Sequence, residues 1–171
     1  MRITLLGTGT SQGIPVIGCQ CDTCTSTDYR DRRLRCSVLV ESSNTSIVID
    51  VGPDFREQML KYNVKKVDSI LLTHEHNDHI IGMDDLRQFL FTNPKTIYIH
   101  GEQRVLNDLK LRFKYAFEQQ PYPGAPELDV KEINAYELLK INDLTVIPLR
   151  VYHGRLPILG FRIGGFAYLT D

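Results

Sequence analysis

Side chains that commonly bind metal ions are concentrated in residues 73–79 of this 171-residue chain. His74, His76 and His79 account for three of its five histidines, and Asp78 lies between the last two. Imidazole nitrogens and carboxylate oxygens are suitable ligands for a borderline divalent ion such as zinc or manganese. A polar surface loop that happens to carry histidines is the alternative, but the scarcity of histidine elsewhere argues against it. The segment therefore predicts a metal site.

The elements on either side of this segment explain how its side chains could converge. Residues 68–72 are largely apolar and predict a buried strand, whereas residues 80–91 predict a helix. A chain that passes directly from a strand into a helix turns sharply. The two histidines of the extended part would then face one metal position, while Asp78 and His79 would turn towards a second.

The remaining segments alternate between strand-like and helix-like, which is typical of α/β layers with functional residues on loops at strand ends. A proline at a plausible first helical position marks a predicted helix over residues 53–60, and apolar spacing predicts another over 104–117. Residues 118–127 are rich in proline and predict a loop that could lie over a site. We expect a single domain over residues 1–171. Further strands are predicted over residues 2–6, 36–41, 46–51, 96–99, 130–134, 144–152, 158–163 and 166–170.

The composition is that of an ordinary soluble domain, with 42% hydrophobic and 24% charged residues. The 20 basic and 21 acidic side chains nearly cancel, which removes the usual electrostatic reason to expect nucleic acid or an anionic membrane as a partner. No apolar run approaches the roughly 20 residues that cross a bilayer. The first seven residues read as a strand and not as a signal peptide, so we expect a cytoplasmic protein.

The H-x-H-x-D-H pattern of residues 74–79 resembles the signature of the metallo-β-lactamase superfamily. The pattern is specific where a buried strand precedes it and an earlier strand ends in Asp-x-Gly, and residues 50–52 read Asp-Val-Gly. The resemblance extends over essentially the whole chain. It implies an α/β fold of four layers, αββα, in which two sheets are flanked by helices.

The resemblance also implies two divalent ions, zinc or manganese, with the remaining ligands at later strand ends. The implied ligands are His74, His76 and His153 for the first ion, Asp78 and His79 for the second, and Asp171 as a bridge between both. A hydroxide held between two such ions is a strong nucleophile near neutral pH. We expect Asp78 and Asp50 to take part in catalysis, Asp50 by accepting a hydrogen bond that orients a metal ligand. His100 has no motif support and is interpreted as structural.

Residues 7–26 form a loop rich in glycine and cysteine, with three of the four cysteines in the arrangement Cys19-x-Cys21-x-x-Cys24. In a reducing compartment, metal binding by thiolates is the better interpretation than disulfides. The glycine spacing, G-x-G-x-x-x-G, is one residue too long for a dinucleotide-binding loop. The segment resembles the N-terminus of the phosphoribosyl 1,2-cyclic phosphate phosphodiesterases, which implies a structural zinc on these cysteines. Cys36 reads as a small buried residue that could also be a fourth ligand.

The phosphodiesterase resemblance implies a small-molecule substrate that is a cyclic or diester phosphate. Arg87 and Arg155 could pair with its phosphate, although solvated surface arginines are the alternative. Three other functions stay open: a transfer-RNA 3′-processing endonuclease of the same superfamily, a non-catalytic zinc-stabilised interaction module, and an acyl hydrolase. We expect no membrane or nucleic-acid partner, and a homo-oligomer is compatible with the sequence.

In the resembled family, about 80 further residues would follow Asp171, within the usual size of a domain. We therefore expect the C-terminal part of the fold to be missing from this chain. That part would carry the last histidine of the second metal position and a histidine of the structural zinc. Weak or absent activity is expected of these 171 residues alone.

Overall fold

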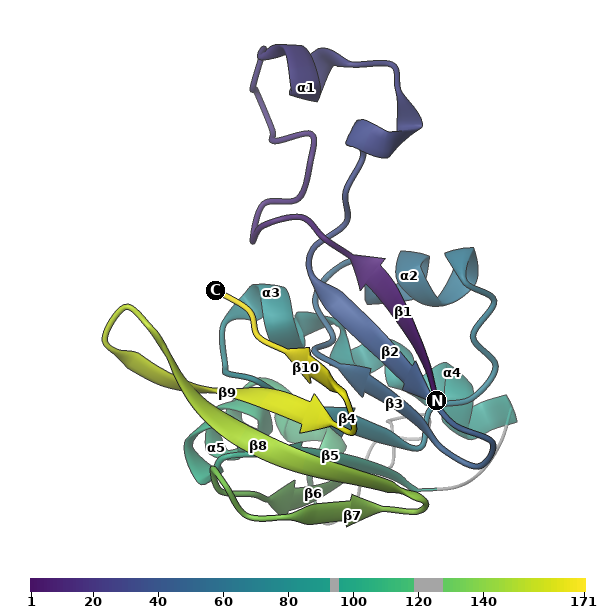
Figure 1. Ribbon diagram of the computed structural model, residues 1–171, viewed down its shortest axis with the longest axis vertical. Helices are drawn as coiled ribbons and strands as arrows, with labels where there is room; N and C mark the ends of the chain where they lie inside the picture. Colours follow the sequence, from purple (N-terminus) through teal and green to yellow (C-terminus); the bar gives the residue numbers. More distant parts are fainter. Residues whose placement is uncertain (93–95, 119–127) are drawn as a thin grey trace.

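The computed structural model describes residues 1–92, 96–118 and 128–171. Two sheets dominate it, one of six strands and one of four (Figure 1). The larger sheet has the strand order β1 (Arg2–Gly7), β2 (Ser37–Glu41), β3 (Ser46–Ile49), β4 (Ser69–Leu71), β5 (Ile97–Gly101) and β6 (Leu128–Glu132). The smaller sheet has the order β10 (Phe166–Tyr168), β9 (Leu156–Ile163), β8 (Leu144–His153) and β7 (Leu139–Ile141).

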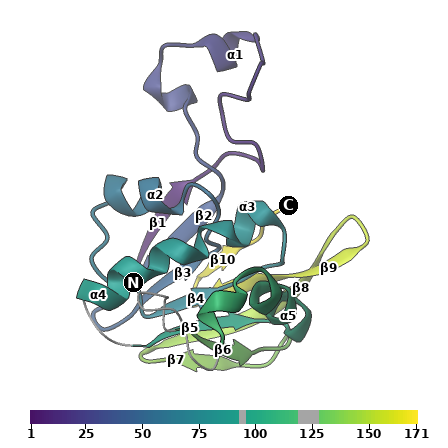
Figure 2. The same cartoon turned by 180° about the vertical axis from the view of Figure 1, so that it is seen from behind.

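The helices of the chain are short, and those that follow β3 cover one face of the larger sheet, as the view from behind shows (Figure 2). Three short 3-10 helices accompany them, η1 (Tyr29–Asp31), η2 (Ile81–Leu86) and η3 (Lys114–Ala116). The α-helices are α1 (Asp22–Thr25), α2 (Phe55–Lys61), α3 (Asn77–Ile80), α4 (Arg87–Thr92) and α5 (Gln103–Arg112).

Two hydrophobic cores hold the layers together, one on each face of the larger sheet. Alternate residues of a strand point to opposite faces, so Val48 packs against the helices while Ile47 and Ile49 pack against the smaller sheet. Phe55 of α2 fills the helical core, and Phe161 of β9 fills the core between the sheets. The α/β class and the two-sheet sandwich are thereby confirmed. Among the described residues, the helices cover the larger sheet alone, so three of the four implied layers are present.

Strand direction determines where the histidine motif of residues 74–79 can act. β1, β2 and β3 are antiparallel neighbours, whereas β3, β4, β5 and β6 run parallel. The carboxyl ends of β3 and β4 therefore meet at the same edge of the sheet. Functional groups of parallel sheets commonly gather at that edge, on the loops after the strands.

Every predicted strand occurs, with ends displaced by no more than two residues, and β7 is an additional strand. The expected continuous helix over residues 80–91 is wrong, because α3 begins at Asn77 and η2 separates it from α4. The cause is the close approach of Gly82 to the segment after β3. Its backbone N–H donates to the carbonyl of Val51 at 2.9 Å instead of continuing an α-helix.

The second predicted helix, residues 104–117, is also shorter than expected. α5 ends at Arg112, and Phe113 leaves the helical conformation with φ −107° and ψ 38° before η3 begins. Phe113 is buried in the helical core, which explains its place in the apolar pattern without a continuous helix. The loop predicted over residues 118–127 lies, apart from its first residue, outside the described residues.

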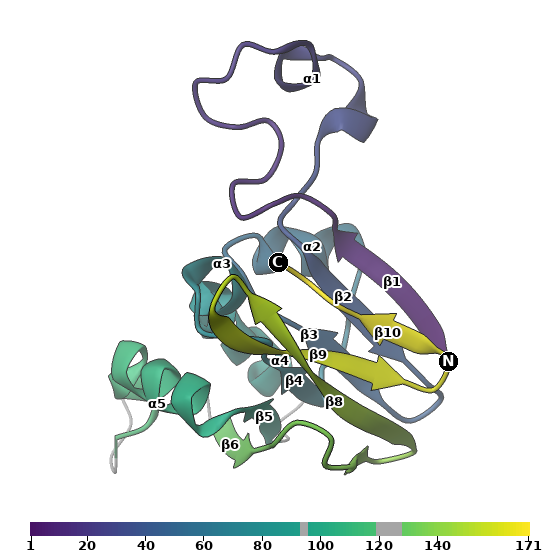
Figure 3. The ribbon, with the colours of Figure 1, turned by 60° about the vertical axis from the view of Figure 1, so that its left-hand side comes forward.

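The segment between β1 and β2 projects from the sandwich and carries α1 and η1 (Figures 1 and 3). Two isolated bridges close its base, Gly9 with Arg35 and Ile14 with Arg33. The four-residue α1 is the first α-helix after the glycines, so the segment does not form the strand–loop–long-helix unit of a dinucleotide site. In the described parts of the chain, no helix has both the length and the apolar character that crossing a membrane requires.

Candidate metal centre

The centre forms where β3 and β4 end side by side. Asp50 follows β3, and its backbone N–H donates to the carbonyl of Leu71 in β4 at 3.0 Å. The next residue, Val51, donates to the carbonyl of His79 in α3 at 2.7 Å. These backbone bonds hold the start of α3 against the two strand ends. Residues from three separate elements are thus brought to one position.

Asp50 is the most buried carboxylate of the centre, with no exposed surface. It accepts hydrogen bonds from the backbone N–H of Thr73 at 2.9 Å and from the Thr73 hydroxyl at 2.9 Å. Nδ1 of His79 lies 2.8 Å from Oδ2 of Asp50. Because an ionised carboxylate only accepts, Nδ1 of His79 carries the proton and Nε2 is turned towards the centre. The predicted orienting role of Asp50 has a matching geometry and stays a prediction.

Thr73 fixes the ring orientation of His74 through a hydrogen bond, as Asp50 does for His79. Its hydroxyl donates to Asp50 and lies 3.0 Å from Nδ1 of His74, so that nitrogen donates to the hydroxyl oxygen. Nε2 of His74 is then free as a lone-pair donor and lies 3.0 Å from Nδ1 of His76. Both buried histidines thus turn Nε2 towards Asp171, with Asp50 as their common support.

The first group of ligand atoms comprises His74, His76 and Asp171, whose ligand atoms all lie within 4.8 Å of one another. Oδ2 of Asp171 is 3.4 Å from Nε2 of His74. Ligands bound tetrahedrally at about 2.0–2.1 Å from zinc lie roughly 3.4 Å apart, so these separations suit a single ion.

A second group comprises Cys36, His79 and Asp171, again with all ligand atoms within 4.8 Å of one another. Oδ2 of Asp171 lies 3.3 Å from Nε2 of His79, and Oδ2 of Asp78 lies 3.1 Å from the same nitrogen. Asp171 therefore belongs to both groups, which is the arrangement of a bridging carboxylate. Figures 1 and 3 show how this becomes possible, because the chain end lies beside α3.

His153, at the end of β8, approaches the first group less closely. Its ring centroid is 5.4 Å from that of His76 and 5.8 Å from that of His74. It nevertheless lines the same hollow of about 530 Å³ as His76, Asp78 and Asp171. The structure thus places His153 at the centre, and its role as a ligand stays a prediction.

Electrostatics distinguish the two buried histidines. Burial, together with the positive charge of His79, lowers the pKa of His74 to about 4, so His74 is neutral at pH 7. Burial also opposes charge on His79, but the nearby carboxylates, Asp50 foremost, raise its pKa to about 9. The negative charges that favour a proton on His79 would equally favour a metal cation in that position.

The two arginines proposed as phosphate ligands lie outside this arrangement. Arg87 forms an ion pair with Asp84, and its Nε also donates to the Asp84 carbonyl at 3.1 Å. Arg155 is exposed in the turn between β8 and β9. Neither occurs among the described residues that line the hollow. The hollow is lined instead by residues that include Thr8 and Ser11 of the glycine-rich loop, which were not predicted from the sequence to belong to the site.

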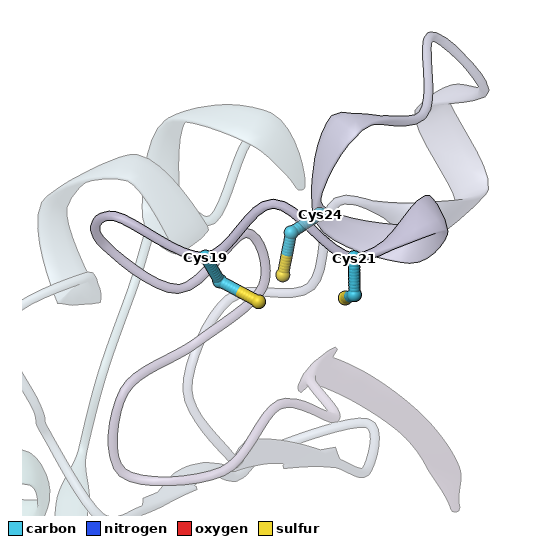
Figure 4. A group of neighbouring side chains, drawn as sticks. All are labelled: Cys19, Cys21 and Cys24. Carbon is cyan, nitrogen blue, oxygen red and sulfur yellow. The ribbon is translucent and has the colours of Figure 1, made fainter.

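The cysteine loop forms a separate candidate metal site (Figure 4). The thiols of Cys19, Cys21 and Cys24 point into a common space, within 4.8 Å of one another, and all are free. Hydrogen bonds, that from the Cys24 backbone foremost, lower the pKa of Cys21. Three thiols at such separations fit the thiolate ligands of a zinc ion. Whether zinc binds there stays a prediction.

Cys36 was expected to be a small buried residue or a further ligand of the cysteine loop. It is only half-buried, and its nearest metal-ligand neighbours are His79 and Asp171. The fourth-ligand interpretation fails because Cys36 directly precedes β2, at the strand ends where the histidine centre forms. His100, interpreted as structural, lies on β5 and lines a different hollow of about 780 Å³ with Ser69.

Comparisons with known proteins were consistent with this geometry. Residues 45–171 match a family model described as "Beta-lactamase superfamily domain". An octanoyltransferase of Porphyromonas gingivalis is 46% identical over 172 residues, which are 100% of this chain and 35% of that protein. Ribonuclease Z of Staphylococcus epidermidis is 29% identical over 168 residues, which are 95% of this chain and 49% of that protein.

A solved structure, described as a new diphosphatase from the PhnP family, is also similar. It superposes with a TM-score of 0.88 at 40% identity, over 99% of this chain and 64% of that chain. The chain thus spans about a third of the octanoyltransferase and about half of the ribonuclease Z. The names of those proteins refer to longer molecules.

Proposed function

Since the chain belongs to the β-lactamase superfamily, we propose that its protein is a metal-dependent hydrolase that cleaves a small cyclic or diester phosphate. The observation that carries the proposal is the position of Asp171, whose carboxylate lies within reach of both His74 and His79. A single carboxylate shared by two groups of ligands is what a centre of two adjacent ions requires.

The donor atoms suit such ions. Nε2 of His79 is fully buried and makes no hydrogen bond with any described residue, although carboxylates lie nearby. Carboxylate oxygens of Asp78 and Asp171 lie 3.1 and 3.3 Å from this nitrogen, and a cation held among the three groups would satisfy all of them. His74, His76 and Asp171, with His153, would hold one ion, and Asp78 and His79, with Asp171, the other. When bound, the ions lower the pKa of water and polarise the phosphoryl oxygens.

The protein's own residues would orient these ligands and bind the substrate. Asp50 and Thr73 keep the rings of His74 and His79 in position, through the hydrogen bonds described above. Thr8 and Ser11 border the hollow together with Asp78. Hydroxyl groups at that border could donate hydrogen bonds to phosphate oxygens. Arg87 is not part of the proposal, because Asp84 occupies its guanidinium group.

Similarity to the diphosphatase at 40% identity supports a phosphate substrate over an acyl group. The octanoyltransferase shares more identity, but this chain covers 35% of that protein, so the name is a weaker guide. Similarity to ribonuclease Z over 95% of this chain keeps the transfer-RNA endonuclease as the alternative within the superfamily. Precursor transfer RNA cleaved faster than small phosphodiesters would favour that alternative.

Turnover of a generic aryl phosphodiester by the full protein, loaded with zinc or manganese, tests the proposal. His76→Ala removes a proposed ligand and is expected to lower kcat/KM by at least about 100-fold, because losing even a partner that only supports a metal ligand costs about 10- to 100-fold. His100→Gln is the matched control, since His100 lines the other hollow, and it should retain turnover. Unchanged turnover in His76→Ala would refute the catalytic assignment.

Metal analysis of the same preparations separates an enzyme from a zinc-stabilised interaction module. The proposed enzyme binds ions at the histidine centre in addition to any zinc on Cys19, Cys21 and Cys24. A protein that binds a single zinc, retained in His76→Ala, would instead favour the module.

A further inference from the structure

The hollow of about 780 Å³ has no part in the function as proposed so far. It lies beside Asp68 and Ser69, where β4 begins, whereas the metal centre follows the carboxyl end of the same strand. In Figure 1 the strands β5, β6 and β7 that border it lie at the lower end of the molecule, away from α3 and the C-terminus. None of its described lining residues also lines the hollow of the metal centre. A cavity of this size is typical of small-molecule sites.

The larger sheet is polar where it borders this hollow. Ile99 of β5 packs on the helices, so its neighbours Tyr98 and His100 point to the opposite face, towards the smaller sheet. Ser69 of β4 lies directly beside Tyr98, and Lys131 of β6 lies directly beside His100, so all four share that face. The inner faces of a sandwich normally supply its core. Polar side chains therefore occupy positions that would otherwise belong to the core between the sheets.

His100 is a buried polar group that lacks a partner in this hollow. Only 6% of its surface is exposed, and its Nδ1 makes no hydrogen bond with any described residue. Burial, together with the positive charge of Lys131, lowers the pKa of His100 to about 4, so the ring is neutral at pH 7. Buried polar atoms without a partner are uncommon in native proteins. The ring therefore points to a ligand or ordered water that completes it.

Positive charge borders the same hollow. Lys66, Lys131 and Lys140 line it, and Asp68 is the one carboxylate among its described lining residues. Lys66 pairs with Asp68 at 2.9 Å, and Lys131 pairs with Asp129 at 2.8 Å. The side chains of these two lysines are 40% and 50% exposed, and ion pairs at exposed positions are weak enough to exchange for another anion. The charge balance favours a ligand with more than one negative charge.

We propose that this hollow binds a small molecule that carries a phosphate group, at a second site apart from the metal centre. A phosphate monoester carries about 1.5 to 2 negative charges near pH 7 and offers three acceptor oxygens. Lys131 of the larger sheet and Lys140 of the smaller would supply ammonium donors, which bind phosphate as point charges. Ser69 and His100 would line the buried side of the site. The inference does not depend on the proposed hydrolase function, because the two hollows share no described residue.

Protection of lysines from reductive methylation, read by mass spectrometry, provides the first test. The full protein is treated with and without inorganic phosphate and, separately, adenosine monophosphate, neither of which contains a diester that the proposed reaction would cleave. Lys131 and Lys140 should be methylated more slowly in the presence of one or both compounds. Lys114 of η3, whose side chain is 80% exposed, is the internal control and should not be protected. Equal methylation of Lys131 and Lys140 under all three conditions would overturn the inference.

Lys140→Gln removes one ammonium group at an exposed position of β7, where surface substitutions rarely disturb a fold. The concentration of phosphate compound that half-protects Lys131 is expected to rise about 10-fold, the cost of losing a hydrogen bond to a charged group. Lys114→Gln, the same change of charge outside the hollow, is the matched control and should leave that concentration unchanged. If the two variants give the same value, Lys140 does not bind the phosphate group, and the proposed site is refuted.

Comparison of the two compounds identifies the ligand more closely. Half-protection at a lower concentration of adenosine monophosphate would assign an organic phosphate whose remaining atoms occupy the hollow, whereas equal concentrations would assign the phosphate group alone. Phosphate bound only at the metal centre would depend on His76. Protection of Lys131 and Lys140 that persists in His76→Ala therefore supports a second site, even if the proposed hydrolase function fails. Protection that disappears in His76→Ala would refute the second site and leave that function intact.

Discussion

Asp50 is a buried carboxylate whose hydrogen bonds all go to residues of the metal centre. It accepts from the backbone and hydroxyl of Thr73 and from Nδ1 of His79, and it has no exposed surface. Burying such a charge is costly unless several donors satisfy it. Its φ of 61° lies in the left-handed region, which Asp and Asn tolerate better than most residues. Asp50 therefore combines a left-handed backbone conformation with a carboxylate that accepts hydrogen bonds from Thr73 and His79.

Asp50→Asn is predicted to weaken zinc binding at the histidine centre by about 10- to 100-fold, the usual cost of losing a partner that orients a metal ligand. Asparagine keeps the backbone conformation and the size, but its amide cannot accept from Thr73 and His79 as a carboxylate does. Competition with a chromophoric chelator measures the affinity. Asp108→Asn, which alters an ion pair with Arg112 on α5, is the control. Equal zinc affinity in Asp50→Asn would contradict the assigned role.

At the scale of elements, the segment after β3 packs closely against α3 and η2 at two glycines, Gly52 and Gly82. A Cβ on Gly82 would lie 2.2 Å from the carbonyl oxygen of Gly52, and a Cβ on Gly52 would lie 2.0 Å from that of Asp78. Real Cβ atoms do not approach backbone oxygens so closely. The contact brings the residues after β3 against α3, and it is this approach that positions Asp78 and His79.

Gly82→Ala is predicted to lower the free energy of unfolding by about 1–3 kcal/mol, the usual range for overpacking. It should also weaken metal binding, because the backbone of α3 has to move away from β3. Urea unfolding and a metal titration measure the two effects. Gly165→Ala is the control, since a Cβ there meets open space. A Gly82→Ala variant as stable as Gly165→Ala would show that the contact is unimportant.

At the scale of the whole molecule, the second sheet is what completes the centre. β8 delivers His153 at its end, and the segment after β10 delivers Asp171. The backbone N–H of Leu159 in β9 donates to the carbonyl of Thr73 at 3.0 Å, which joins the smaller sheet to the histidine segment. The core between the sheets therefore determines how the ligands from the two halves of the sequence meet.

Phe161→Ala is predicted to lower the free energy of unfolding by about 3–5 kcal/mol, because Phe161 is fully buried in that core. Metal affinity should fall as well, since the smaller sheet would no longer be held in place. Chemical denaturation measures the stability. Leu138→Ala, at a position 71% exposed, should change it by less than about 0.5 kcal/mol. Similar losses in both variants would refute the proposed importance of the core between the sheets.

Much of the fold and the core of the candidate site could be predicted from the sequence alone. The signals were local: largely apolar segments for the strands, and a dense H-x-H-x-D-H motif next to one of them. Such patterns depend on neighbouring residues, whose geometry is set by the strand or helix they form. The helix boundaries were less predictable, because Gly82 interrupts the helix through a contact with a strand end distant in sequence.

A bridging Asp171 was implied by the family resemblance, but only the folded chain brings its carboxylate beside both His74 and His79. Tertiary structure alone decided that Cys36 joins the second group. These relations do not follow from spacing along the chain. They depend on how the two sheets pack and on where the chain passes after β1 and β10. The sequence by itself determined the chemistry that is available, and the packing of distant segments decided where that chemistry comes together.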